Sequence, residues 1–275
     1  MKTTLSVLLA REAPVGVILR RGPSKQVLMV RWDLERDTFE AGQWLKARVY
    51  EDCCDLSPQG DRLLYLAAKY TGKQHGTWTA ISRPPYFTAL ALWPLNGTWQ
   101  GGGGVFLSQS EVVLYQLESE LSPDFSLPAW LKASIQIQGS VFTDRMLHDG
   151  WELIQRGTAA NGGKFDPPEI WSKPSPKRSL VSLRFQIQGY GDAPNPRVYA
   201  VEGESNVDLG AADWADWCPS GDLLFAREGK IYRAAGDTLL AKELVDLSAL
   251  KFEEREAPIE ARQWEGALPI GIRIT

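Results

Sequence analysis

Cysteine and histidine are both scarce in this sequence. Its 275 residues include three cysteines and two histidines. An odd number of cysteines, two of which are neighbours at Cys53 and Cys54, cannot supply a disulfide framework. Adjacent strand residues point to opposite faces, so this pair does not form the cluster that a soft metal needs. We therefore expect free thiols, a cytoplasmic protein, no metal site and no cofactor.

The chain also lacks a long hydrophobic run. The apolar stretch near the N-terminus, residues 5–10, is shorter than the apolar core of a signal peptide and ends at Arg11 and Glu12. Elsewhere charges, glycine or proline interrupt every run before the ~20 apolar residues of a membrane helix are reached. We therefore expect no association with a membrane.

Neither sign of charge is in large excess. Lysine and arginine total 30, aspartate and glutamate total 34, and the formal net charge is −4. A protein that binds nucleic acid through its phosphates usually carries a marked basic excess. We therefore expect no nucleic-acid partner.

Helical periodicity is almost absent, and residues 248–255, with Ser248 as N-cap, form the one helix candidate. Short hydrophobic runs of about five or six residues, the usual length of a strand, recur instead. They are residues 15–19, 26–30, 63–67, 89–93, 111–115 and 180–185. The 25 glycines and 17 prolines supply turns between such strands, and the 11 tryptophans supply large core anchors. The sequence therefore predicts an all-β fold made of hairpins.

The most specific feature is an internal repeat. Asp-Leu-Ser-Pro-Gln-Gly-Asp, which begins at Asp55, aligns with Asp-Trp-Cys-Pro-Ser-Gly-Asp, which begins at Asp216. Both copies continue into Leu-Leu and an aromatic residue. Proline presets φ near −65° and glycine accepts a positive φ, so each copy predicts a tight turn between two strands.

These two segments resemble the Ser-Pro-Asp-Gly signature of TolB-like propeller repeats, also called WD40-like repeats. In that family the motif joins the first and second strands of a blade. Gln59 and Ser220 stand where the family has aspartate, and Cys218 stands where it has serine. The resemblance covers the two motif segments and implies a β-propeller.

The spacing of the repeat sets the expected number of blades. Asp55 and Asp216 are 161 positions apart, which is four units of about 40 residues, the usual length of a propeller blade. We predict a single β-propeller domain over residues 1–275 with five blades. Six blades, with the sixth inside residues 119–145, and a pair of β-sandwiches are the alternatives. Strands at residues 5–10 and 270–274 are expected to pair and close the ring.

Two loops carry the candidate binding residues. The first is aromatic and cationic, and its Arg83 and Tyr86 are residue types that dominate binding hot spots. In the second, Trp99 precedes four consecutive glycines, where a ligand could approach the backbone at Gly102. No helix or lysine follows as in a phosphate-binding loop, so no nucleotide site is expected. For each aromatic residue the alternative is packing between blades.

Groups suited to catalysis are few. His148 lies near Asp144 and Asp149, but neither a nucleophile elbow nor zinc-protease spacing is present, so this segment is expected to be a polar turn. Several five-bladed families that resemble this architecture place carboxylates in a central funnel. Asp33, Asp144 and Asp213 are the candidates for such a pair of glycosidase carboxylates.

We interpret the chain as a non-catalytic propeller scaffold that binds a protein partner through its loop face. Its candidate binding residues are Arg83, Tyr86, Trp99 and Gly102, and no catalytic residue is assigned. The alternative function is a glycan-directed hydrolase with carboxylates in the central funnel.

Overall fold

The structure, a computed structural model, is all-β. It describes residues 3–22, 26–70, 76–117, 119–189, 197–203, 206–210, 212–235, 240–269 and 271–274. Five sheets follow one another along the chain and are the blades of a five-bladed β-propeller. The predicted fold class and five-blade count are confirmed.

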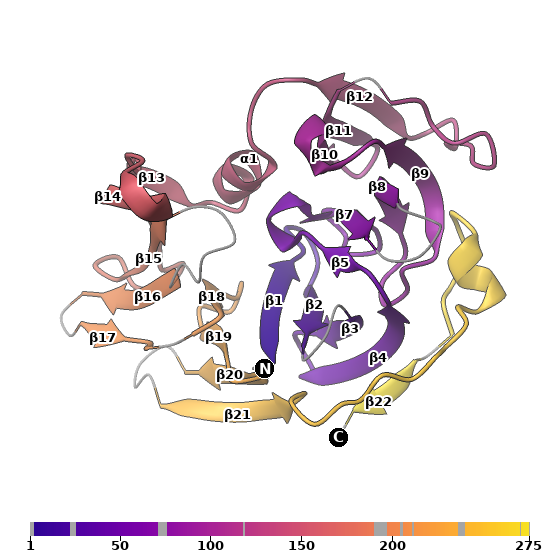
Figure 1. The fold of residues 1–275 in the computed structure, drawn as a ribbon. Coiled ribbons are helices and arrows are strands. Elements are labelled where there is room, and N and C mark those ends of the chain that lie inside the picture. The colour runs from indigo at the N-terminus through magenta and orange to yellow at the C-terminus, as the bar shows by residue number, and fades with distance from the viewer. Residues whose placement is uncertain are drawn as a thin grey trace. The chain divides into compact units, whose positions relative to one another are not determined.

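The described chain divides into two compact units, residues 1–145 with 249–275 and residues 146–248. The first unit holds three sheets (Figure 1). The first sheet contains β1 (Thr4–Leu9), β2 (Val15–Arg21), β3 (Val27–Asp33), β4 (Thr38–Leu45) and β22 (Ile272–Ile274). The second contains β5 (Arg48–Val49), β6 (Asp55–Leu56), β7 (Leu63–Lys69), β8 (Gly76–Ser82) and β9 (Ala89–Leu95). The third contains β10 (Gly101–Ser108), β11 (Glu111–Gln116) and β12 (Lys132–Gln136).

The second unit holds the other two sheets. The fourth sheet contains β13 (Glu152–Gln155), β14 (Lys164–Pro174), β15 (Ser182–Gly189), β16 (Arg197–Glu202) and β17 (Val207–Asp208). The fifth contains β18 (Trp214–Trp217), β19 (Leu223–Arg227), β20 (Lys230–Ala234) and β21 (Ala241–Asp246). Neighbouring strands in both sheets are antiparallel, as expected for hairpins.

The helices are few and short. The α-helix α1 (Val141–His148) covers the segment that was expected to be a polar turn, and that expectation is wrong. Ser140 begins the helix, because its carbonyl accepts the Asp144 N–H and its hydroxyl accepts the Thr143 N–H. The helix expected at residues 248–255 does not form. Single turns of 3₁₀ helix occur at η1 (Glu51–Cys53), η2 (Thr98–Gln100), η3 (Asn161–Gly163) and η4 (Ile259–Arg262).

The two copies of the repeat occupy equivalent places in their sheets, as predicted. Asp55 pairs with Leu64 across β6 and β7, and Asp216 pairs with Leu224 across β18 and β19. Each turn contains a glycine with positive φ, +72° at Gly60 and +81° at Gly221. The turn of the first copy is one residue longer. The Ser57 N–H donates to the Arg62 carbonyl, whereas the Cys218 N–H donates to the Asp222 carbonyl.

The aspartate that opens each copy is buried and forms an ion pair with a basic residue of the preceding sheet. Asp55 Oδ1 lies 2.8 Å from Arg11 Nη2, and its Oδ2 accepts the Phe106 N–H of β10 at 2.7 Å. Asp216 Oδ1 lies 2.7 Å from Lys173 Nζ of β14. Burial raises the pKa of Asp216, and the nearby Lys173 acts in the opposite direction. The shared aspartate therefore ties neighbouring sheets together.

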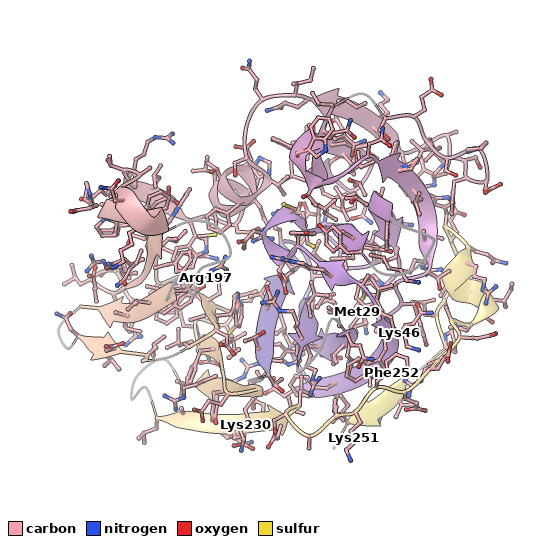
Figure 2. The ribbon with its side chains drawn as sticks, in the orientation of Figure 1. Met29, Lys46, Arg197, Lys230, Lys251 and Phe252 are labelled. Atoms are coloured by element: carbon pink, nitrogen blue, oxygen red, sulfur yellow. The ribbon has the colours of Figure 1, made fainter. Side chains whose placement is uncertain are left out.

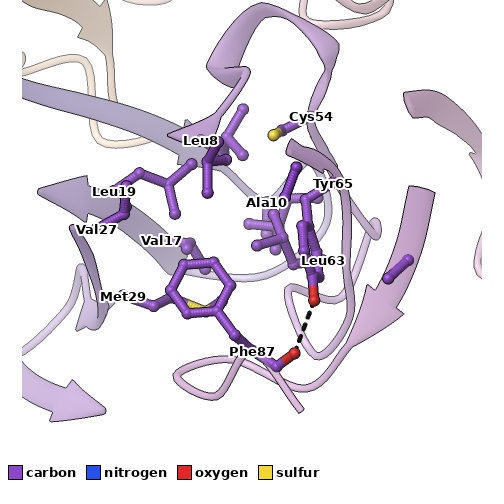
Figure 3. Packing of buried hydrophobic residues seen from close by; sticks show 14 of the residues in the cluster. Leu8, Ala10, Val17, Leu19, Val27, Met29, Cys54, Leu63, Tyr65 and Phe87 are labelled. Carbon is purple, nitrogen blue, oxygen red and sulfur yellow. Dashed lines mark hydrogen bonds between the residues drawn. The ribbon is translucent and has the colours of Figure 1, made fainter. Parts of the chain in front are cut away.

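The first and second sheets share one apolar core. Leu8 and Leu19 of the first sheet and Leu63 and Tyr65 of β7 are all buried there (Figure 3). The Tyr65 ring lies edge-on to Phe87, with 5.5 Å between ring centroids, and its hydroxyl donates to the Phe87 carbonyl at 2.7 Å. Each buried side chain of this size contributes about 1.5–3 kcal/mol.

The two ends of the chain share a sheet but do not pair with each other. β22 pairs with β4 over Ile272 to Ile274, and β1 lies at the opposite edge of the same sheet. Strands from both ends therefore complete one sheet, as predicted, but they do not pair directly, since β2, β3 and β4 separate them. Residue 270 of the expected strand lies outside the described residues.

We expect Gly60→Ala to lower the free energy of unfolding by about 2–4 kcal/mol. Besides the positive φ, a Cβ there would lie 2.8 Å from Val15 Cβ and 3.0 Å from Ala10 Cβ. Gly162→Ala is the control, because Gly162 also has a positive φ, +75°, but a Cβ there would have no atom within 4 Å. We expect it to lower the free energy of unfolding by about 1 kcal/mol. Denaturant unfolding measures both, and equal losses would contradict the packing argument.

Candidate functional site

Arg83, the first candidate binding residue, is buried against this chain's own C-terminal segment. We call residues 249–269 the C-terminal strap. The Arg83 guanidinium donates to four strap carbonyls, those of Glu260, Gln263, Glu265 and Gly266, at 2.5 to 3.2 Å. Only 7% of Arg83 is exposed. Burial and the neighbouring positive charge of Arg62 lower its pKa.

Tyr86, the second candidate, packs on the same strap. It is buried against Ala257, Ala261 and Leu268. Arg83 and Tyr86 therefore both contact the strap.

Three residues that no sequence motif marks, Arg62, Trp130 and Trp264, also hold the strap. Arg62 donates to the Trp264 carbonyl at 2.7 Å and lies over the Trp130 ring, 4.6 Å from its centroid. Trp130 and Trp264 meet edge to face with 5.8 Å between ring centroids. A guanidinium over a tryptophan ring is a stabilising cation–π contact. Arg62, Trp130 and Trp264 are so far apart in the sequence that no local motif contains them.

The strap also contacts the first sheet before it reaches Tyr86. Lys46 lies 4.3 Å from the centroid of the Phe252 ring, and the two side chains lie close together in Figure 2. Arg255 donates to the carbonyls of Ala41 and Gly42 at 2.8 and 3.1 Å. The strap thus crosses the first and second sheets of its unit (Figure 1, yellow).

Gly102 and its neighbours are positions of close packing. A Cβ on Gly102 would lie 2.4 Å from Leu66 Cδ1, and one on Gly103 would lie 2.0 Å from the Cys53 carbonyl oxygen. Gly102 is buried and has φ +131°. The glycine run therefore lets β10 approach the second sheet closely.

Trp99 is the candidate that lies on the surface. Its side chain belongs to η2 and is 74% exposed. Trp99 and Arg83 lie at opposite ends of β8 and β9, because Thr77 pairs with Leu95 and Ser82 with Ala89. Seven strand residues span roughly 20 Å, so the four candidates do not form one surface.

Tyr50 and Leu117 hydrogen-bond to Thr98 and Gln100, the residues that flank Trp99 in the chain. Tyr50 hydrogen-bonds the hydroxyl of Tyr70, which is 45% exposed, and also contacts the Thr98 hydroxyl. Leu117, 38% exposed, donates its N–H to the Gln100 carbonyl. We call Tyr50, Tyr70, Trp99 and Leu117 the Trp99 surface. Burial and the hydrogen bond to Tyr70 raise the pKa of Tyr50 to about 12, so its hydroxyl stays protonated at neutral pH.

Two of the three candidate carboxylates, Asp33 and Asp144, have local hydrogen-bond partners. Burial acts to raise the pKa of Asp33, but hydrogen bonds from Arg36 and Glu35 outweigh it and lower the pKa. Asp144 accepts a hydrogen bond from the Tyr115 hydroxyl. Asp213 belongs to the second unit, where its N–H donates to the Ala226 carbonyl. Asp33 therefore lies at the end of β3 with Arg36 as its partner, and Asp144 lies on α1 with Tyr115 of β11 as its partner.

The remaining reactive groups are thiols and imidazoles. Cys53, Cys54 and Cys218 are free, and the last two are buried. His148 is exposed at the end of α1, and His75 lies outside the described residues. In the described part of the chain no three histidine, cysteine or acidic side chains cluster in a way that could hold a metal ion.

Comparison with known proteins gives no relative. No protein-family model matches the chain, and no curated protein or solved structure matches it either. None of the described helices has the length and apolar character needed to cross a membrane.

We expect Arg83→Ala to lower the free energy of unfolding by at least about 2 kcal/mol, since it removes the donor to four carbonyls. Limited proteolysis should also cut the strap faster. Arg83→Lys should recover part of the loss, because one ammonium cannot reach all four acceptors. Trp99→Ala is the control and should stay within about 0.5 kcal/mol of the parent. A stable, protease-resistant Arg83→Ala protein would contradict this role.

Cys53 and Cys54 should be inert in the folded protein at pH 8. Burial and the nearby Asp52 raise the pKa of Cys53 to about 11, and burial raises the pKa of Cys54 as well. Because only the thiolate attacks a disulfide reagent, these two thiols should react slowly with Ellman's reagent in the folded chain. All three thiols should react in guanidinium chloride. Rapid reaction of Cys53 without denaturant would show that its pKa is not raised.

Proposed function

We propose that this chain is a non-catalytic propeller scaffold that binds a protein partner, and that the Trp99 surface is where the partner docks. The observation that carries the proposal is the 74% exposure of the Trp99 side chain. Tryptophan and tyrosine are the residues most enriched in binding hot spots.

The backbone beneath this surface is closely packed. Gly101 pairs with Gln116 at the start of β10, and Gln100 accepts the Leu117 N–H. The Asn96 N–H donates to the Gln100 side chain at 2.8 Å, which ties η2 to the end of β9. An aromatic anchor on a fixed backbone binds at a lower entropic cost than one on a mobile loop.

Arg83, Tyr86 and Gly102 contribute to this function indirectly in our proposal. Arg83 and Tyr86 hold the strap, and Gly102 lets β10 pack beside the second sheet. Of the four residues first considered, Trp99 is therefore the proposed contact with the partner.

We further propose that the chain is a single propeller domain of the TolB-like or WD40-like type that acts in the cytoplasm. The equivalent turns that follow Asp55 and Asp216 support the family assignment. The free cysteines support a reducing compartment.

The test compares quantitative capture of binding proteins from the native lysate by the parent chain and by Trp99→Ala. We expect Trp99→Ala to weaken binding of a saturable partner by about fivefold or more. Leu107→Ala is the matched control, because Leu107 is also exposed, at 49%, but lies near the other end of β10, the strand that follows η2. Equal binding by all three proteins would overturn the proposal, and so would hydrolysis of glycans by the purified chain.

A further inference from the structure

The third sheet ends in a strand with an open edge. Its strand order is β10-β11-β12, so β12 has a neighbour on one side. All five residues of β12 are exposed, and Ile135 is 47% exposed. A strand edge of this kind presents unpaired backbone donors and acceptors to any extended chain that approaches.

The register shows which backbone groups point outward. β12 runs parallel to β11, and the Lys132 N–H donates to the Ser110 carbonyl at 2.9 Å. Because backbone groups alternate in direction along a strand, Ser134 and Gln136 also face β11. The N–H and C=O groups of Ala133 and Ile135 therefore face away from the sheet. Within the described residues these groups have no backbone partner.

The corresponding edges of the other sheets are protected by recognisable devices. β22 has three residues and β17 has two, so both edges are short. β9 contains Pro94, and the Ser122 N–H donates to its Leu92 carbonyl. β21 carries Lys242, Glu243 and Asp246 among its six residues. Short strands, proline, covering loops and charges are the usual ways to block edge pairing, and β12 shows only Lys132.

We propose that β12 pairs antiparallel with β12 of a second copy of this chain, about a two-fold axis through Ser134. This register uses the whole strand, because Ser134 is its midpoint. Ala133 of each copy then faces Ile135 of the other, and these two pairs exchange four backbone hydrogen bonds. The three-stranded sheets join into one continuous sheet of six strands.

The side chains of β12 are complementary in this register. Ala133 and Ile135 lie on one face, so a small side chain meets a large one at each pair. On the other face Lys132 meets Gln136, and Ser134 meets its own symmetry mate. Lys132 carries the only charge of the strand, so no like charges face each other. A five-residue strand pair buries less than the roughly 1,000 Å² of a stable interface, so the dimer is reversible and depends on concentration.

Sedimentation equilibrium of the full chain over a range of concentrations tests the proposal. We expect a monomer–dimer equilibrium in the parent. Gln136→Glu places a carboxylate opposite Lys132 at two symmetric positions, so it should lower the dissociation constant of the dimer about fivefold at low salt. Gln136→Lys places a second lysine opposite Lys132, so it should raise the dissociation constant by a similar factor. Gln136 is exposed and its amide donates only to the nearby Gln138 carbonyl among the bonds described, so neither change should alter the fold.

Ile135→Pro removes an outward N–H and leaves the bonds to β11 in place, so we expect a folded monomer. Ile135→Val keeps that N–H and is the matched control, which should still dimerise.

A parent chain that is monomeric at every concentration would overturn the proposal. The β12 edge would then be a candidate site for an extended segment of another protein. A dimer that neither Gln136 variant changes would also overturn it. Dimerisation does not involve Trp99, so Trp99→Ala should leave the equilibrium unchanged and separates this proposal from the proposed function.

Discussion

The buried aspartate of the repeated turn is the contact on which the arrangement of the sheets most depends. Asp55 accepts from Arg11 of the first sheet and from the Phe106 backbone of the third, while its own strand belongs to the second. One side chain with 2% exposure therefore joins three sheets. A buried carboxylate is tolerated only when such partners satisfy it. In the second unit, Asp216 forms the equivalent ion pair with Lys173.

The C-terminal strap covers Arg83 and Tyr86, two of the four candidate binding residues. Arg62, Arg83 and Arg255 donate to backbone carbonyls of the strap or of the strand beside it. The strap contains almost no regular structure, so its carbonyls need donors from elsewhere. Arginine suits this task because one guanidinium offers five N–H groups. Residue types that are typical of binding hot spots are used here to hold the chain to itself.

The two surfaces that we propose for association lie on or beside the second and third sheets of the first unit. The Trp99 surface and the β12 edge differ in physical character. Aromatic rings on the Trp99 surface offer apolar area, whereas the β12 edge offers backbone hydrogen bonds. An aromatic surface recognises side chains of a partner, and an edge recognises an extended backbone. The two sites can therefore serve different associations without competing for the same residues.

The all-β class, the five blades and the turns at Gly60 and Gly221 are predictable from the sequence alone. They follow from local patterns, since strand length, the positions of proline and glycine, and the repeat spacing can all be read along the chain. Contacts between distant segments of the folded chain are needed to show that Arg83 and Tyr86 contact the strap, that Gly102 packs against Leu66, and that Trp99 is exposed. The tertiary structure also placed β22 beside β4 and left the edge of β12 open. The reason is that Arg83 meets Gly266 across 183 positions of the chain, and no local pattern specifies which distant segment covers a side chain.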